Sequence, residues 1–258
     1  MDVELFAAST SISLSRHLHQ NYEGLLRHWL AGNSTIIDEL FDDFEGSPPD
    51  AIVCSVGGGG LLNGIMLGLD RHGWADKVTV LALETEGADC LSRSLQAGSQ
   101  VSMQEITSIA RSLGASRVSD KTWDLVQQYP NIRSVVLRDA DAARACVRFA
   151  EEQKMIVEPA CGVCLAMLYD DLLEELIPGL GPESRVVVIV CGGEREAWFL
   201  LPGKLDKLIA DSLIGSNIDV ERLLEYELEY GQTGKGSSRS RSTLTIDGAT
   251  QVRNLSRM

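Results

Sequence analysis

Four consecutive glycines, Gly57 to Gly60, follow a short apolar run that begins at Ala51. Each glycine lacks a Cβ and can turn its backbone N–H toward a bound anion at φ values that other residues resist. A helix expected from Leu61 adds free N–H groups and the positive end of its dipole. A tight strand-to-helix turn is the plainer interpretation, but it needs only one or two glycines. The run therefore predicts a phosphate-binding loop.

The glycine run completes neither of the common nucleotide-binding motifs. No Lys-Ser or Lys-Thr pair follows it, which excludes a P-loop. Gly57 and Gly59 fit a dinucleotide fingerprint, but Leu62 stands where that motif needs its third small residue. Glu84 follows a later apolar run and keeps a Rossmann-like nucleotide binder open as a weaker alternative. A general phosphate site remains.

Composition limits the class of protein. The chain has 258 residues, of which 44% are hydrophobic and 23% charged, as in soluble globular proteins. Its formal net charge of −14 disfavours nucleic acids and anionic membranes as partners. No apolar run approaches the roughly 18 residues of a membrane span, and the N-terminus lacks the positive charge of a signal peptide. We therefore expect a cytoplasmic protein with small-molecule partners.

Six cysteines lie mainly in apolar runs, which is typical of reduced core residues. They are Cys54, Cys90, Cys146, Cys161, Cys164 and Cys191. Cys161 and Cys164 form a C-x-x-C, which is compatible with half a zinc site or a redox pair. Neither a second pair nor a thioredoxin-like strand accompanies it, so we predict a structural role.

Apolar runs alternate with helical patterns along the chain. Strands are expected over 51–56, 78–83, 132–137 and 186–190, and helices over 61–72, 121–128, 140–154 and 159–176, with Asp139 capping the third helix. Continuously apolar strands predict an α/β fold in which helices cover both faces of a parallel sheet. Ligands bind at the C-terminal strand ends of such sheets, where the glycine loop, Glu84 and Cys191 should converge.

Five groups of residues then resemble one family, in the family's own order. They are CSVGGGGLL at 54–62, ALETEGA at 82–88, ITSIA at 106–110 with LGA at 113–115, VEPACG at 157–162 and VCGG at 190–193. Together they resemble the second half of the pyridoxal-phosphate-dependent serine/threonine dehydratases of fold type II, and look closest to the eukaryotic L-serine dehydratases. The resemblance runs from about Asn33 to Gly193 and covers only the C-terminal half of the family fold.

The resemblance implies a cofactor, pyridoxal 5′-phosphate (PLP), and a role for five residues. Gly57, Gly58, Gly59 and Gly60 would hold the cofactor phosphate, and Cys191 would lie against the pyridine nitrogen. A neutral thiol there leaves that nitrogen unprotonated, which suits β-elimination. Without the resemblance, the plainer interpretation of Cys191 is a cysteine that packs in the hydrophobic core.

The resemblance also implies a structural monovalent cation, potassium in this family. Its ligands would be the Glu84 carboxylate and the backbone carbonyls of Gly57, Ala88, Leu113 and Ala115. Hard oxygen ligands suit such an ion. The plainer interpretation of Glu84 is a solvated carboxylate at a strand end.

The family's catalytic lysine has no counterpart in the expected place. That Schiff-base lysine lies near the start of the fold and also removes the substrate Cα proton. The first lysine here is Lys77, beyond the glycine loop, so no catalytic residue is identified. Residues 9–11 and 33–35 only loosely match the segment with which the family binds the substrate carboxylate. We expect this chain alone to be inactive.

The two ends depart from the family, and four parts are expected: a non-family N-terminal segment (1–32), a partial PLP-binding large domain (33–200), an acidic helical extension (201–230) and a disordered basic tail (231–258). A helix over 17–30 would carry His17, His19 and His28, for which a solvated face is favoured over a metal site. For the tail, a solubilising role is favoured over binding to nucleic acid or an acidic partner.

Two functions remain open. The first is an L-serine (L-threonine) dehydratase or ammonia-lyase that forms pyruvate or 2-oxobutyrate and ammonia, with an amino-acid substrate and a homodimeric assembly. The second is a non-catalytic truncated remnant, or an interaction module that keeps only the phosphate or PLP site. The position of Lys77 favours the second for this polypeptide, whereas the resemblance favours the first for its family.

Overall fold

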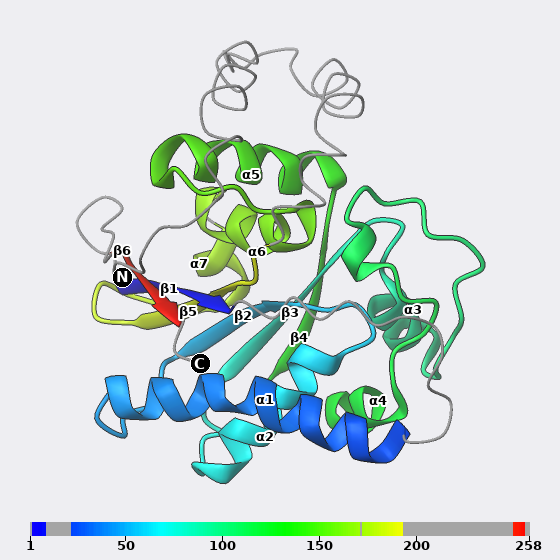
Figure 1. Ribbon diagram of the computed structural model, residues 1–258, viewed down its shortest axis with the longest axis horizontal. Helices are drawn as coiled ribbons and strands as arrows, with labels where there is room; N and C mark the ends of the chain where they lie inside the picture. The colour runs from blue at the N-terminus through cyan, green and yellow to red at the C-terminus, as the bar shows by residue number, and fades with distance from the viewer. Residues whose placement is uncertain (1, 9–21, 171, 193–249, 256–258) are drawn as a thin grey trace.

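The computed structural model describes residues 2–8, 22–170, 172–192 and 250–255, of which 31–170 and 172–192 are described with their side chains. A six-stranded sheet forms its centre, in the order β4-β3-β2-β5-β1-β6 (Figure 1). Every pairing in it is parallel. The strands are β1 (Asp2–Ala8), β2 (Ala51–Ser55), β3 (Thr79–Thr85), β4 (Ile132–Leu137), β5 (Arg185–Val190) and β6 (Thr250–Leu255).

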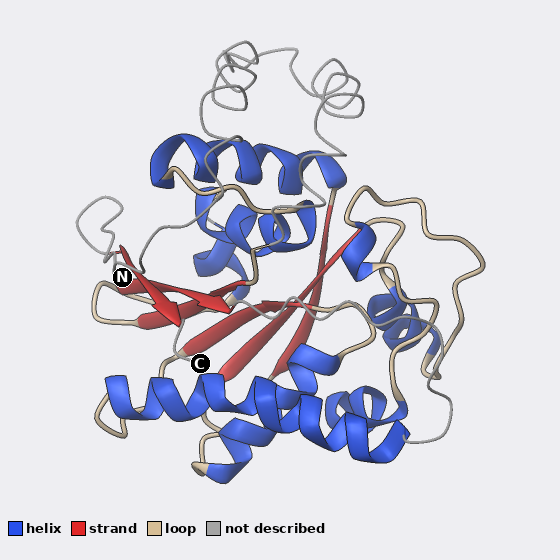
Figure 2. Cartoon of the chain, viewed as in Figure 1, coloured by secondary structure: helices blue, strands red, loops and turns tan. Residues whose placement is uncertain are grey.

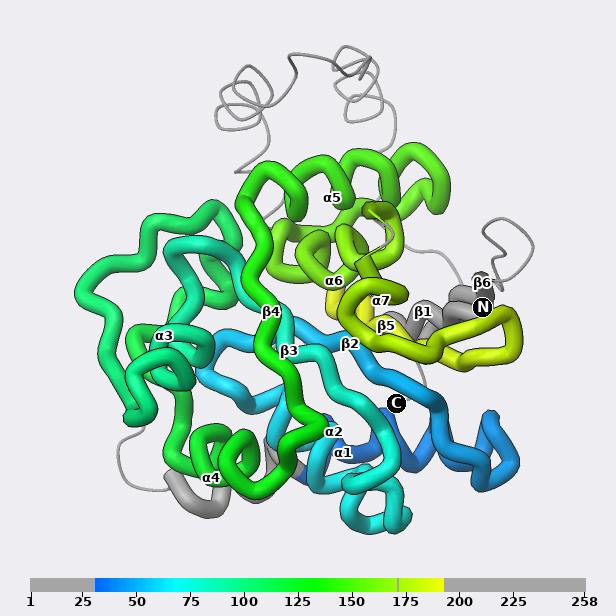
Figure 3. Tube along the Cα trace, turned by 180° about the vertical axis from the view of Figure 1, so that it is seen from behind, coloured from blue at the N-terminus to red at the C-terminus, as the bar shows by residue number. Residues whose placement is uncertain are grey.

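Helices lie on both faces of this sheet (Figure 2). They are α1 (Tyr22–Asp43), α2 (Gly60–Arg71), α3 (Cys90–Ala97), the short 3-10 helix η1 (Arg111–Leu113), α4 (Asp120–Gln128), α5 (Asp139–Gln153), α6 (Pro159–Tyr169) and α7 (Leu172–Leu176). One face carries α1 and α2, and the other carries α5 and α6. The view from behind shows β4 at the edge of the sheet, running from α4 up to α5 (Figure 3).

The two faces bury alternate residues of the same strands. Val53 and Val188 belong to the core beneath α5 and α6. Ile52 and Val187 belong to the core beneath α1 and α2. When both faces of a strand are buried, none of its side chains reaches solvent, and this explains the continuous apolar sequence of these strands. The predicted α/β fold with a helix-covered parallel sheet is confirmed.

Two predicted helix boundaries were wrong. Arg138, not Asp139, is the N-cap of α5. Asp139 is the first helical residue, and its carboxylate instead accepts hydrogen bonds from Ser108 Oγ and Ile109 N. The helix expected over 159–176 ends at Tyr169, and α7 follows as a separate short helix. The eight-residue α3 and the three-residue η1 were not predicted, because they are too short to show a helical period.

The chain termini also differ from expectation. The expected non-family segment 1–32 contains β1 and the start of α1, which runs on to Asp43. The expected disordered tail 231–258 contains β6, which pairs in parallel with β1. The remainder of that tail, the expected acidic extension, His17 and His19 lie outside the described residues. Among the residues that the structure describes, no helix is both long and apolar enough to cross a membrane.

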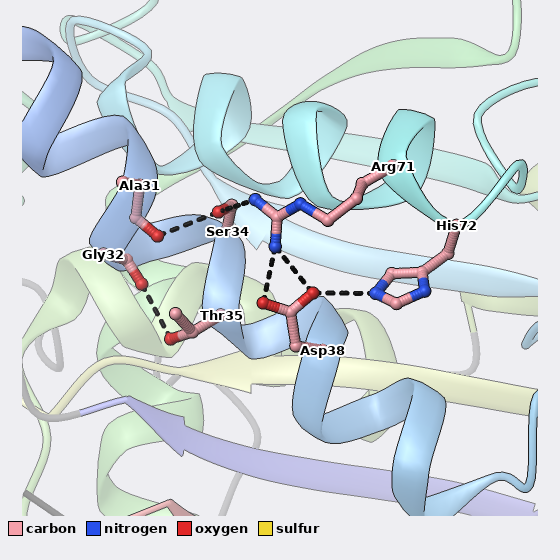
Figure 4. A network of polar contacts seen from close by, with 7 residues as sticks. All are labelled: Ala31, Gly32, Ser34, Thr35, Asp38, Arg71 and His72. Atoms are coloured by element: carbon pink, nitrogen blue, oxygen red, sulfur yellow. Dashed lines mark hydrogen bonds and ion pairs between the residues drawn. The ribbon is translucent and has the colours of Figure 1, made fainter.

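A polar network fixes α2, the helix that follows the glycine loop, against α1 (Figure 4). The Arg71 guanidinium donates to both oxygens of Asp38, at 2.5 and 2.6 Å, and to Ser34 Oγ at 2.6 Å. His72 Nε2 lies 2.7 Å from Asp38 Oδ1. Burial alone would raise the pKa of Asp38, but these two partners outweigh it and the pKa is lowered. The network therefore joins the end of α2 to the middle of α1.

Candidate functional site

The glycine loop joins β2 to α2 at the C-terminal edge of the sheet. Gly59 is the N-cap residue of α2 and has a φ of 95°, in the region that favours glycine. A Cβ on Gly59 would lie only 1.9 Å from Thr122 Oγ1. The backbone conformation and the close approach of α4 therefore both require glycine at this position.

The carbonyl oxygens of the loop all accept hydrogen bonds from the protein. Gly57 O receives Cys90 Sγ at 3.7 Å, Gly58 O receives Ser119 N at 3.0 Å, Gly59 O receives Asn63 N at 2.8 Å, and Gly60 O receives Asn33 Nδ2 at 3.3 Å. These contacts come from four different elements or loops. The loop is therefore held through its acceptors.

The donors of the same loop are left available. Among the described residues, the N–H groups of Gly57 to Gly60, and those of Leu61 and Leu62 in the first turn of α2, meet no hydrogen-bond acceptor. Gly58 and Gly60 are exposed, and a Cβ on Gly60 would meet nothing within 4 Å. A loop whose carbonyls are bonded and whose N–H groups are free, next to a helix N-terminus, suits an anion.

A buried polar network fastens this loop to the start of α4. Asn63 Nδ2 donates to Ser119 Oγ at 3.1 Å, and Thr122 Oγ1 donates to Asn63 Oδ1 at 3.0 Å. Ser119 is also the N-cap of α4 and accepts from Thr122 N. Sequence reasoning missed this network: a serine before a helix suggests a cap, but nothing in the sequence points to Asn63 as its partner.

Glu84 is fully buried near the end of β3, so it is not the solvated carboxylate of the plainer interpretation. Its two oxygens accept hydrogen bonds from Leu91 N and Ser92 N in the first turn of α3, each at 2.8 Å. Burial raises the pKa of Glu84 to about 7, although those two N–H groups work in the opposite direction. Glu84 therefore holds the N-terminus of α3.

Most of the predicted cation ligands lie around the glycine loop. A Cβ on Gly57 would lie 3.2 Å from Leu113 Cα, and one on Gly58 would lie 3.9 Å from Ala115 Cβ. Ala88 lies in the turn between β3 and α3, where its N–H donates to Thr85 O. Glu84, which supplies the one carboxylate of the set, precedes the same turn. The cation itself stays a prediction.

Cys191 follows β5 at the same edge of the sheet and is partly exposed. Burial, and then the charge of Glu158, raise the pKa of its thiol to about 11, against a small opposing effect of Ser55. The thiol is therefore neutral near pH 7. The other five cysteines are buried, and Cys161 and Cys164 lie inside α6, in keeping with the structural role predicted for them.

The segment ITSIA is held by a second network at this edge. Ser108 Oγ lies 2.7 Å from Thr85 Oγ1 and donates to Asp139 Oδ1 at 2.6 Å. Ile109 N donates to the other oxygen of Asp139 at 2.9 Å. The ends of β3 and the start of α5 thus fix the segment that leads into η1 beside the glycine loop.

Comparison with known proteins identifies the family. A family model described as "Pyridoxal-phosphate dependent enzyme" matches residues 15–192. The chain belongs to the pyridoxal-phosphate-dependent enzyme family. The match begins earlier than Asn33, where the sequence motifs predict that the family segment starts. It includes the Asn63 network that fastens the glycine loop and the Asp139 network that holds the ITSIA segment.

Proteins similar to this chain are named as dehydratases or as an ammonia-lyase. It is 38% identical over 184 residues to a catabolic L-serine/threonine dehydratase of Saccharomyces cerevisiae, covering 69% of this chain and 51% of that protein. It is 40% identical over 169 residues to a putative truncated L-serine dehydratase of the same yeast, covering 63% and 80%. A solved L-serine ammonia-lyase from Rhizomucor miehei superposes with a TM-score of 0.62 at 37% identity, covering 78% of this chain and 56% of that one.

This member of the PLP-dependent family spans about half the length of the yeast dehydratase and of the fungal ammonia-lyase that it matches. The family match over residues 15–192 contains the glycine loop, β3 and β5. The agreement in fold confirms the predicted resemblance to the C-terminal half of fold type II enzymes.

The lysines of the described part of the chain are Lys77, Lys121 and Lys154. Lys77 precedes β3 and so lies at the opposite edge of the sheet from Glu84. Lys154 is the C-cap of α5, and its Nζ donates to Glu151 O. Lys121 is exposed in the first turn of α4, the helix that contacts Gly58 and Gly59. Lys204, Lys207 and Lys235 lie outside the described residues.

A separate surface cavity of about 220 Å³ opens between α5 and α6. Its lining includes Asp141, Arg144, Arg148 and Tyr169. None of the residues predicted to hold PLP or a cation lines it. The candidate site therefore rests on the loop geometry at the edge of the sheet, and this cavity is not part of it.

Proposed function

We propose that this chain carries the phosphate-binding half of an L-serine (L-threonine) dehydratase, a PLP-dependent ammonia-lyase. In the complete enzyme the reaction is β-elimination, which gives pyruvate or 2-oxobutyrate and ammonia. The observation that carries the proposal is the loop at 57–60, whose carbonyls are bonded while its N–H groups meet no acceptor among the described residues. PLP supplies the electron-accepting ring on which such eliminations depend.

The residues present fit that cofactor. The N–H groups of Gly57 to Gly60 and the N-terminus of α2 would bind its phosphate. Cys191, a neutral thiol at the end of β5, would face the ring nitrogen without protonating it. A monovalent cation, potassium, would bind between Glu84 and the neighbouring carbonyls and brace the loop. We also propose that the protein is homodimeric and cytoplasmic.

A charge placed in the loop tests the phosphate site. Gly60→Asp puts a carboxylate where a Cβ meets nothing within 4 Å, and an acid in the first turn of α2 favours the helix dipole. The variant should therefore fold yet bind phosphate poorly. Gly181→Asp is the matched control, because its Cβ also meets nothing within 4 Å and it lies before β5, at the other edge of the sheet.

Equilibrium dialysis against PLP measures the effect. We expect Gly60→Asp to weaken binding at least about tenfold, from the repulsion of two negative charges at close range, and Gly181→Asp to leave it unchanged. Equal affinity in the wild type and Gly60→Asp would contradict the proposed site.

A second candidate is a non-catalytic module that keeps only the phosphate or PLP site. It is favoured by the placement of Lys77 and Lys154 and by the match to a putative truncated yeast dehydratase. Borohydride reduction of the chain with PLP, followed by peptide mapping, distinguishes this non-catalytic module from a catalytic dehydratase. This candidate predicts no stoichiometric pyridoxyl-lysine and no pyruvate from L-serine. A single labelled lysine, for example Lys121, together with pyruvate formation would contradict it.

A further inference from the structure

Glu158 stands where three loops meet beside the candidate site. It is the N-cap of α6 and is half-buried. Its carboxylate Oε2 accepts a hydrogen bond from Ser112 Oγ at 2.8 Å. Its backbone N–H donates to Gly192 O at 3.1 Å. One residue thus contacts the η1 segment through its side chain and the loop after β5 through its backbone.

The Ser112 end of this connection lies against the glycine loop. A Cβ on Gly57 would lie 3.3 Å from Ser112 O and 3.2 Å from Leu113 Cα. Space between η1 and the loop is therefore smaller than a methyl group. Any displacement of Ser112 would be transmitted to Gly57, because close-packed backbone cannot move independently.

The other end lies at Cys191, the residue next to Gly192. The charge of the Glu158 carboxylate acts on the Cys191 thiol and raises its pKa. Among the residues that the structure describes, the other titratable groups that interact with this thiol are those of Cys54, Cys161 and Cys164, all buried and with raised pKa values. Because neutral thiols contribute no net charge, Glu158 supplies the main electrostatic influence on Cys191 within the described part of the chain.

We propose that Glu158 is a positioning residue for the cofactor site: held by Ser112, it ties the glycine loop to the Cys191 loop and sets the charge that Cys191 faces. This rests on the proposed function in so far as the two loops hold the phosphate and the ring of one cofactor. The distance between those two loops must then match the length of the cofactor. A residue that bridges them fixes that distance before the ligand arrives.

Four variants separate the tether from the charge. Glu158→Gln keeps an acceptor for Ser112 but removes the charge, whereas Ser112→Ala keeps the charge and removes the tether. Glu158→Asp keeps the charge on a side chain one methylene shorter. Glu152→Gln is the matched control, because Glu152 is an exposed carboxylate of α5 that pairs with Arg148 away from the site. Circular dichroism checks that each variant folds.

Two measurements are made on each variant: the pH profile of Cys191 alkylation by iodoacetamide without PLP, read by peptide mass spectrometry, and PLP affinity by dialysis. Glu158→Gln should alkylate about threefold to tenfold faster below the thiol pKa, a fall of roughly half to one pKa unit. Its PLP affinity should stay within about twofold of wild type, since the tether survives.

Ser112→Ala and Glu158→Asp should show the reverse: alkylation close to wild type, and PLP affinity reduced about fivefold, the value of one ordinary hydrogen bond. Alkylation of Glu158→Gln that overlays the Glu152→Gln control would overturn the charge relation. Unchanged PLP affinity in Ser112→Ala would overturn the tether. A wild-type chain that binds no PLP would refute the proposed function, while the alkylation comparison would still decide whether Glu158 controls Cys191.

Discussion

Adjacent glycines of the loop should respond in opposite ways to the same substitution. Gly59 has a φ of 95°, and a Cβ there would lie 1.9 Å from Thr122 Oγ1 and 2.8 Å from Thr122 Cβ. Gly60 is the first residue of α2, and a Cβ there would meet nothing within 4 Å. Gly59→Ala and Gly60→Ala therefore add the same methyl group to two different environments.

The magnitudes follow from those environments. A non-glycine residue in the left-handed region costs roughly 1–2 kcal/mol. The overlap with Thr122 must also be relieved by moving α4, which breaks hydrogen bonds worth about 1 kcal/mol each. Gly59→Ala should therefore lower the free energy of unfolding by about 3 kcal/mol or more, since these costs add. Gly60→Ala should change it by less than about 1 kcal/mol, and in the stabilising direction, because alanine restricts the unfolded chain.

Urea denaturation of the two variants and the wild type, followed by circular dichroism at one pH, measures both free energies. The comparison is internal, because the variants differ only in which of two neighbouring residues carries the methyl group. Equal destabilisation in both, or a Gly59→Ala variant as stable as the wild type, would refute the geometry described for the loop.

Two further predictions concern the residues that hold the site. Ser119→Ala removes the N-cap of α4 and leaves Asn63 Nδ2 without its acceptor, so we expect unfolding to become easier by about 1–3 kcal/mol in thermal or urea melts; a loss below that of an exposed serine variant such as Ser99→Ala would contradict this. Burial raises the pKa of Glu84 to about 7, so between about pH 4.5 and 7 the folded protein holds a proton that the unfolded chain has lost. The stability that Glu84 contributes is therefore fully present below about pH 4.5 and is lost as the pH rises through 7. In potassium-free buffer the wild type should therefore lose about 3 kcal/mol of stability relative to Glu84→Gln between pH 5 and 8, and parallel pH profiles would show that Glu84 does not titrate there.

The parallel sheet could be predicted because strands that are buried on both faces have continuously apolar sequences. The strand expected over 132–137 has the same bounds as β4. The strand expected over 186–190 matches β5 except that β5 begins one residue earlier, at Arg185. The loop at 57–60 was predictable for a related reason: consecutive glycines after a buried strand have few structural uses. Parallel pairing then placed Glu84 and Cys191 at the same edge, since β2 lies between β3 and β5.

What could not be predicted depends on contacts between segments distant in sequence. Asp139 looks like a helix cap because it precedes an alanine-rich helix, but tertiary hydrogen bonds to Ser108 and Ile109 use its carboxylate. Asn63 shows no special pattern, yet it joins α2 to α4. Glu158 belongs to the VEPACG segment, but the sequence does not predict its contact with Ser112, since only the fold brings the two residues together.

The loop owes its shape to the protein rather than to a ligand. Cys90, Ser119, Asn63 and Asn33 bind its four carbonyl oxygens from separate parts of the chain. A loop fixed in this way needs little reorganisation to bind an anion, so most of the interaction free energy appears as affinity. The same contacts lie entirely on this half of the fold and involve no catalytic lysine. The phosphate binding that we propose for this loop therefore does not require a catalytic lysine.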